Sequence, residues 1–194
     1  LFVKKDRGDD FVNWRNSTLS GRSLQFTTIS ALSLIVRDIC EANGLRIDEK
    51  SLGGVVPSDQ DLQRAYSLSV EWIEAAFTAF TVLHEVRENP SLLPEYRDLE
   101  NKWSLLLRPA GQISLFRAAR LAQEELGHQF NVASFMASAA RLDWSAVSPV
   151  WDNVLVQGRS RILAKRTNYE DAAHLILWLS VGDSLPNPER FQRD

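Results

Sequence analysis

The stretch SDQDLQRAYSLSVEWIEAAFTAFTVLHEVR, residues 58–87, decides the fold class of this chain. Apolar side chains recur in it every three or four positions, the spacing of one face of an α-helix; they are Leu62, Tyr66, Val70, Ile73, Phe77 and Phe80. Ser58 and Asp61 stand three residues apart ahead of this face, which is close to the pattern of a capping box. We therefore predict one long helix over residues 59–87, the spine of a mainly α-helical domain.

A second helix is expected before the spine, over residues 28–42. Apolar residues again recur at helical spacing there, Thr27 or Thr28 can cap the start, and Asn43-Gly44 supplies the stop. Its single cysteine, Cys40, falls on the apolar face, so we expect a buried and inert thiol rather than a nucleophile.

Four further helices are expected after the spine. Pro90 and Pro94 cannot continue a helix, whereas Pro109 suits a first helical turn, and Asn131 and Asn168 are good N-cap residues. The expected ranges are 95–107, 109–127, 132–142 and 169–182. The chain between them, near residues 143–167, reads as irregular with two short extended pieces, 153–157 and 160–164.

The expected architecture is a single helical domain of about six helices, over residues 22–185. A flexible segment, residues 1–21, precedes it, and a tail, residues 186–194, follows it. No apolar run approaches the roughly 18 residues that a membrane helix needs, so we expect no membrane partner. With one cysteine, the chain suits the reducing cytoplasm. It begins at a leucine rather than a methionine, which suggests a fragment of a longer protein.

No assembled catalytic or metal site is expected. The sequence has neither a GxxxxGK[ST] loop nor GxGxxG, and it has no GxSxG elbow. The three histidines, His84, His128 and His174, lie on separate predicted helices or their ends, so we name no catalytic residue, metal ligand or cofactor. An enzyme is the less favoured class for this segment.

The stretch LDWSAVSPVWDNVLVQGRSRILAKRTN, residues 142–168, carries the main basic cluster. The formal net charge is −3, so any nucleic-acid surface must be a local patch. Its basic residues could track a phosphate backbone or form a solvated face; they are Arg159, Arg161, Lys165 and Arg166. Trp144, Trp151 and Trp178 could stack on bases if exposed, but core anchors are the favoured interpretation.

A second cluster lies ahead of the first helix, in WRNSTLSGRS, residues 14–23. Arg15, Arg22 and the neighbouring hydroxyls offer several donors to phosphate oxygens near a helix N-terminus. The alternative, that they brace the helix end, stays open.

Both clusters fall inside segments that resemble a known family. NSTLSGRSLQFTTISAL resembles the Asn-Ser-x-x-x-x-x-Ser-x-x-Phe-Thr-x-Ser segment of the DGQHR-domain family, whose best-known members are the DndB-type DNA sulfur modification regulators. At the other end, Asp143-Trp144-Ser145, Trp151-Asp152, Gly158-Arg159 and Asn168 match a second family pattern. Asn153-Val154 replaces the family's usual Gly-Arg, and the Asp-Gly-Gln-His-Arg signature is absent from these residues. The chain thus resembles the helical C-terminal region of that family.

The resemblance implies a DNA-binding transcriptional regulator of a bacterial DNA-modification (phosphorothioation) or phage-defence gene cluster. The residues expected to contact nucleic acid are Arg159, Arg161, Lys165, Arg166, Arg22 and Asn168. DNA, other proteins of the cluster and a second copy of the chain are the expected partners.

Two alternatives remain. The chain could be an accessory or enzymatic component of DNA base modification of the 7-deazaguanine type, with its chemistry in a missing N-terminal domain. It could also be a helical protein-interaction module, in which Ala118, Ala119 and Ala122 permit close approach of a partner helix.

Overall fold

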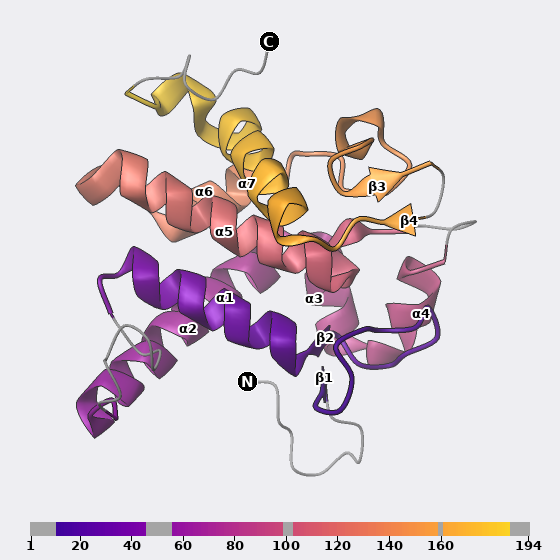
Figure 1. The fold of residues 1–194 in the computed structure, drawn as a ribbon, viewed down its shortest axis with the longest axis horizontal. Coiled ribbons are helices and arrows are strands. Elements are labelled where there is room, and N and C mark those ends of the chain that lie inside the picture. Colours follow the sequence, from indigo (N-terminus) through magenta and orange to yellow (C-terminus); the bar gives the residue numbers. More distant parts are fainter. Residues whose placement is uncertain (1–10, 46–55, 99–102, 159–160, 187–194) are drawn as a thin grey trace.

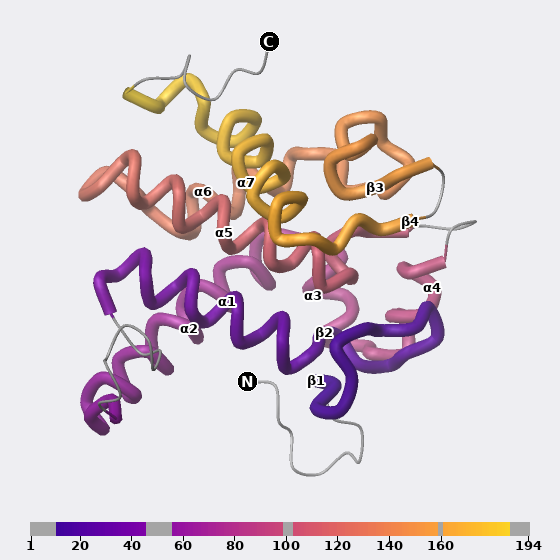
Figure 2. The backbone as a smooth tube through the Cα atoms, viewed as in Figure 1, coloured from indigo at the N-terminus to yellow at the C-terminus, as the bar shows by residue number. Residues whose placement is uncertain are grey.

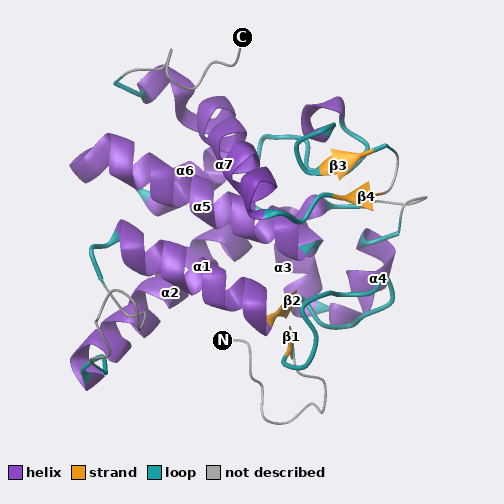
Figure 3. Ribbon diagram, viewed as in Figure 1, coloured by secondary structure: helices purple, strands orange, loops and turns teal. Residues whose placement is uncertain are grey.

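The computed structural model describes residues 11–45, 56–98, 103–158 and 161–186. Within these ranges the chain is mainly α-helical, as expected, with only two small two-stranded sheets (Figures 1 and 3). The α-helices are α1 (Ile29–Ala42), α2 (Asp59–Ala79), α3 (Thr81–Glu88), α4 (Leu93–Tyr96), α5 (Pro109–Leu126), α6 (Val132–Ala139) and α7 (Arg166–Val181).

Helix α5 lies at the centre of the fold. It packs against α1 on one side and α7 on another, while α2 contacts α1 and α6 (Figures 1 and 2). Residues 110–119 of α5 are all buried, so this helix has no solvent face along half of its length. Ala118, Ala119 and Ala122 are fully buried here, which makes them internal packing positions rather than a surface for a partner helix.

Gly111 in the first turn of α5 allows a close approach to the backbone of Leu105. A Cβ atom built at this position would stand 2.2 Å from the carbonyl oxygen of Leu105. Leu105 belongs to a 3-10 turn, Leu105–Leu107, whose residues are all buried directly before α5. The missing side chain of Gly111 therefore lets this turn fold against the helix that follows it.

The predicted helix starts are confirmed at three helices. The Thr28 hydroxyl accepts a hydrogen bond from the backbone N–H of Ala31, and Asn131 does the same for Ser134 at the start of α6. Ser58 and Asp61 form a reciprocal capping box ahead of α2. Each cap satisfies backbone donors that the first helical turn leaves without an intrahelical partner.

The predicted spine, residues 59–87, is wrong as one continuous helix. Phe80 has extended backbone angles (φ −101°, ψ 112°) and separates α2 from α3. This break lets its ring enter the core, where it meets Trp144 edge-on at a centroid distance of 5.8 Å. The buried face of α2 also differs, because Leu62 and Tyr66 are exposed; it consists of Ala65, Ser69, Trp72, Ile73, Ala76 and Phe77.

The predicted helix over residues 95–107 is also wrong. Helix α4 ends at Tyr96, and residues 99–102 lie outside the described ranges. Pro94 lies in the first turn of α4, where the lack of an N–H is tolerated. The backbone beyond it pairs with a distant segment instead: Leu105 N–H donates to Trp144 O at 2.9 Å, and Ala146 N–H to Trp103 O at 2.9 Å.

Two short sheets flank the helical core. Strand β1 (Val12–Asn13) pairs in parallel with β2 (Thr27–Thr28), with Val12 opposite Thr27. Val12 is buried, so the segment expected to be flexible packs onto the domain at this point, while residues 1–10 lie outside the described ranges. Strand β3 (Val156–Gln157) pairs antiparallel with β4 (Arg161–Ile162), inside the two pieces that were expected to be extended.

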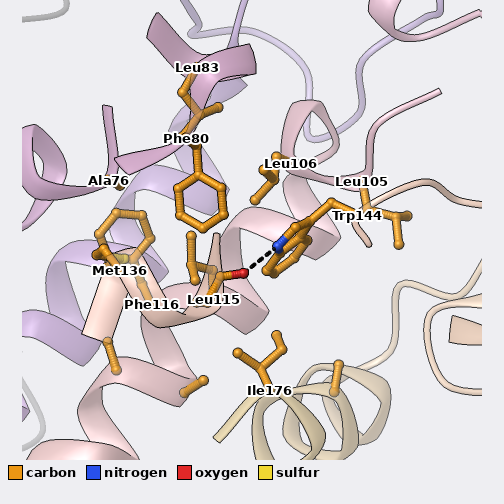
Figure 4. Close-up of a cluster of buried hydrophobic side chains, with 14 of the residues drawn as sticks. Ala76, Phe80, Leu83, Leu105, Leu106, Leu115, Phe116, Met136, Trp144 and Ile176 are labelled. Atoms are coloured by element: carbon orange, nitrogen blue, oxygen red, sulfur yellow. Dashed lines mark hydrogen bonds between the residues drawn. The ribbon is translucent and has the colours of Figure 1, made fainter. Parts of the chain in front are cut away.

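The larger of two hydrophobic clusters in the described ranges joins most of these elements, and Figure 4 shows part of it. Phe80, Leu115 and Trp144 lie together there, and the Trp144 indole N–H donates to the Ala139 carbonyl at 2.9 Å (dashed line). Among the described residues, no helix combines the length and the apolar composition that a membrane crossing requires.

Candidate nucleic-acid interface

Two tryptophans anchor the segment that carries the main basic cluster. Trp144 and Trp151 are 6% and 0% exposed, and their rings pack against each other at a tilt of 32° with centroids 5.0 Å apart. The Trp151 indole N–H donates to Asp143 O at 2.6 Å. Neither ring can stack on a base, so the interpretation as core anchors is confirmed for both. Trp178 on α7 is partly buried and contacts Gly182.

Beyond this anchor the chain forms a short ribbon from β3 and β4. Gly158 has a positive φ of 62°, which favours glycine and lets the chain reverse after β3. Gln157 faces Arg161 across the pair, and the Arg161 guanidinium lies 3.4 Å from Gln157 Oε1. Arg161 is exposed, whereas Arg159 lies outside the described residues.

The chain from this ribbon runs directly into the N-terminus of α7. Lys165 is the N-cap residue, makes no side-chain cap, and is exposed. Arg166, the first helical residue, is 87% exposed and donates to Glu170 Oε1 at 2.8 Å. This hydrogen bond lowers the pKa of Glu170. Two cations therefore stand at the positive end of a helix dipole, where an anion would be stabilised.

The expected role of Asn168 as the N-cap of the last helix is wrong. Asn168 lies in the first turn of α7, three residues after the N-cap Lys165, and its amide donates to Val154 O at 3.1 Å. The N-cap of α7 lies three residues before the predicted cap at Asn168, because Lys165 adopts the extended backbone conformation of an N-cap residue. Asn168 thus ties the start of α7 to the chain ahead of β3 and fixes the ribbon relative to the helix.

No acidic residue occurs between Asp152 and Glu170 in the sequence. In this interval Arg161, Lys165 and Arg166 are exposed and belong to the described chain. We call this surface, formed by these three residues, the basic ribbon surface. It is a local patch of positive charge on a chain whose net charge is negative.

Arg22 lies apart from the basic ribbon surface, on the loop between β1 and β2. Ser23 N–H donates to Ser20 O at 3.2 Å, which places Gly21 and Arg22 at the tip of a turn. Figure 1 shows this loop beside α4 and toward the same end of the long axis as β3 and β4. The structure thus brings the two clusters to one end of the molecule, without a hydrogen bond between them among the described residues.

The sequence analysis did not single out two residues that matter for this loop, Trp14 within it and Arg97 against it. Trp14 is 51% exposed, although tryptophan is mostly buried in folded proteins. Arg97, by contrast, is 1% exposed and donates to the carbonyls of Ser23, Gln25 and Phe26 at 2.6–3.1 Å. The polar neighbours of Trp14 could have indicated its exposure; Arg97 gave no sequence signal.

The described residues offer little to a hydrolytic or metal centre. No group of three or more His, Cys, Asp or Glu side chains in the described ranges is arranged to hold a metal ion. Cys40 is buried, and burial raises the pKa of its thiol, which confirms its expected burial. The two most deeply buried ion pairs in the described ranges join Asp38 of α1 to Arg117 and Arg120 of α5 at 3.3 and 3.2 Å, where they tie two packed helices together.

Comparison with known proteins adds no relative. No family model matches the chain, and no curated protein or solved structure matches it either.

Proposed function

We propose that this chain is a DNA-binding region of a transcriptional regulator of a bacterial DNA-modification (phosphorothioation) or phage-defence gene cluster. The sequence resemblance to the DGQHR-domain family supplies the biological setting. The observation that carries the proposal is the basic ribbon surface, where Arg161, Lys165 and Arg166 are exposed at the uncapped N-terminus of α7.

The surface suits phosphate groups in two ways. Exposed guanidinium and ammonium groups neutralise phosphates and release the counterions that surround DNA. The first-turn backbone N–H groups of α7 have no side-chain cap, so they can donate to a phosphate oxygen as well. Contacts of this kind fix a protein on the DNA backbone and carry no base sequence directly.

The ribbon is also held rigidly enough to present these groups. Asn168 joins α7 to the carbonyl of Val154, and the buried Trp151 fixes the same segment to the core. Leu163 N–H donates to Leu155 O at 2.8 Å, which holds the strand that leads from β4 to α7. The cations therefore project from an ordered frame, and binding would order little more than their side chains.

The test is a fluorescence-anisotropy titration of the chain with a labelled duplex at low and moderate salt. We expect salt-sensitive binding to all duplexes. The double variant R161E/K165E should weaken binding at least tenfold and reduce the slope of log affinity against log salt by about 2, since each phosphate contact contributes about 0.9.

The matched control is R64E/R141E, which changes the net charge equally at two other exposed arginines. It should retain most of the affinity. Equal losses in both double variants would show that only total charge matters. Unchanged binding by R161E/K165E would refute the assignment of this surface.

A further inference from the structure

We infer that the loop from Trp14 to Gln25 binds single-stranded DNA by stacking an unpaired base on the Trp14 indole. This inference rests on the proposed function for its DNA setting, but it names a different site and a different state of the DNA. Three properties of the loop carry it: the exposure of its aromatic ring, its rigid attachment, and its charge.

The exposure of Trp14 is unusual within this chain. Trp72, Trp103, Trp144 and Trp151 are at most 6% exposed, whereas Trp14 is 51% exposed. Leu24 on the returning limb of the same loop is 43% exposed.

The loop that carries Trp14 is fixed at both ends. At its start, the Asn13 side-chain oxygen accepts from the backbone N–H groups of Arg15 and Asn16 at 3.0 and 2.9 Å. At its end, the buried Arg97 guanidinium donates to Ser23 O and Gln25 O at 2.7 and 2.6 Å. Trp14 is therefore presented from an ordered backbone, which lowers the conformational entropy lost on binding.

The loop carries positive charge only, which favours a nucleic acid as its partner over a protein surface of mixed charge. No acidic residue occurs from Phe11 to Arg37 in the sequence. Arg15 and Arg22 are exposed, and neither guanidinium has a hydrogen bond or ion pair within the described part of the chain. Exposed Asn16, Ser17, Thr18 and Ser20 add neutral donors for phosphate oxygens. An aromatic ring beside unpaired arginines is the combination that single-strand binding surfaces use.

The occupant is an unpaired strand rather than a duplex because of base geometry. In a duplex the faces of the bases are covered by their neighbours, so an indole can only reach them at an end or a flipped base. In a single strand every base has a free face, and stacking is tolerant of sequence. The loop also lies toward the same end of the molecule as the basic ribbon surface, so one DNA with paired and unpaired parts could meet both (Figure 1).

The experiment measures binding of the chain to a labelled 15-nucleotide thymidine oligomer and to a labelled duplex, by fluorescence anisotropy at low salt. Trp14→Ala should weaken binding to the single strand about 5- to 150-fold, the range for loss of one stacked base. Its affinity for the duplex should stay within about twofold. Trp14→Phe should retain most of the single-strand affinity, because a phenyl ring still stacks.

The matched control is Tyr66→Ala, which removes an aromatic ring of similar exposure, 59%, from α2. It should leave single-strand binding unchanged. If Trp14→Ala binds the thymidine oligomer as tightly as the parent, or if Tyr66→Ala loses as much, the inference is overturned. Sedimentation in parallel covers the other occupant: a change of oligomeric state in Trp14→Ala, without a change in single-strand binding, would make the loop a protein contact.

The two proposals fail separately. Loss of duplex binding in R161E/K165E together with an unaffected Trp14→Ala would leave the proposed function in place and remove the stacking site. Loss of single-strand binding in Trp14→Ala, with a duplex affinity that R161E/K165E does not change, would support the stacking site and refute the basic ribbon surface.

Discussion

The buried Arg97 guanidinium should stabilise the domain by clamping the β1–β2 loop. It donates to Leu107 O at 2.8 Å, Ser23 O at 2.7 Å, Gln25 O at 2.6 Å and Phe26 O at 3.1 Å. Three of these carbonyls belong to the end of the β1–β2 loop, 71–74 residues before Arg97 in the sequence, and the fourth belongs to the turn before α5. The Arg97 side chain thus satisfies backbone carbonyls of this loop that lie outside the strands, and it holds the loop against the turn before α5.

The expected magnitude follows from two opposing terms. A hydrogen bond to a charged group contributes about 1.5–3 kcal/mol, so four of them give about 6–12 kcal/mol. Burial and the nearby Arg108 lower the pKa of Arg97 to about 10, which corresponds to about 3 kcal/mol spent on holding the charge. After truncation, water can reach the half-exposed Ser23 and Gln25, and Phe26 O keeps a hydrogen bond from Gln112 Nε2. We therefore expect Arg97→Met to lower the free energy of unfolding by about 3–5 kcal/mol.

The assay is urea unfolding followed by circular dichroism, with the m-value checked against the parent so that a change in midpoint reports stability. Arg97→Lys keeps the charge but cannot reach four acceptors, so it should lose most of the same free energy. Arg64→Met, a truncation of an exposed arginine, is the control and should change stability by less than about 0.5 kcal/mol. A loss below about 1 kcal/mol in Arg97→Met would refute the clamp. If Arg97 holds the loop, hydrogen exchange at the amides of residues 23–26 should also be faster in Arg97→Met than in the parent.

Four further predictions concern single sites. Gly111→Ala should destabilise the domain by more than about 1 kcal/mol in urea unfolding, although alanine favours helices, because its Cβ would lie 2.2 Å from Leu105 O; a stabilised variant would contradict this. Cys40 should resist a thiol reagent in the folded chain and react on unfolding, because the thiol is buried with a raised pKa; rapid native labelling would contradict it. Burial raises the pKa of Asp38 in the folded chain despite two neighbouring arginines. The contribution of this shift to the free energy of unfolding is therefore fully present at a pH below the ordinary pKa of an aspartate, and it is lost as the pH rises through the pKa of the folded state. The unfolding free energy of the parent minus that of Asp38→Asn should therefore grow as pH falls toward 4, and a shrinking difference would show that the arginines dominate. Lys165→Asp should stabilise the chain by about 1 kcal/mol in thermal unfolding, because it caps α7, and should weaken duplex binding, because it removes the proposed phosphate contact; a destabilised variant would contradict the uncapped geometry.

The sequence predicts best where the controlling interaction is local. The caps at Thr28, Ser58 and Asn131 are confirmed because each joins a side chain to a backbone N–H three residues away. Pro109 opens α5 for the same reason, since its fixed φ and missing N–H suit a first helical turn. The burial of Cys40 also follows from its place on the apolar face of one helix.

Prediction fails where a distant segment decides the backbone. Nothing near Phe80 breaks a helix; the break is favoured because Trp144, far along the chain, offers its ring a buried contact. Leu105 leaves the expected helix because its N–H pairs with Trp144 O. The strand at Val12 likewise forms only because Thr27 returns beside it. Such pairings depend on tertiary contacts that propensity does not contain.

The candidate site shows the same division. The cations of the basic ribbon surface could be predicted from the sequence, because no acidic residue stands among them in the chain. The sequence did not show which of the tryptophan rings would be exposed. The segment around Trp144 and Trp151 was the more prominent in sequence, yet both rings are buried, whereas Trp14 is exposed. Asn168 was predicted to cap the last helix, but its amide donates to Val154 O instead, because an N-cap amide and an amide that joins two segments have the same sequence signature.

The start of α7 combines exposed cations with the lack of a side-chain cap. Helices α1, α2 and α6 begin with a hydroxyl or amide cap, whereas α3, α4, α5 and α7 begin without a side-chain cap. At α7 two exposed cations, Lys165 and Arg166, also stand at the positive end of the helix dipole. That arrangement costs stability in the isolated chain. Natural sequences break such local rules mainly at functional or strained sites. A bound phosphate would do so twice, since it accepts from the free N–H groups and neutralises the cations, and this is why a stabilising cap at Lys165 and weaker DNA binding should appear together.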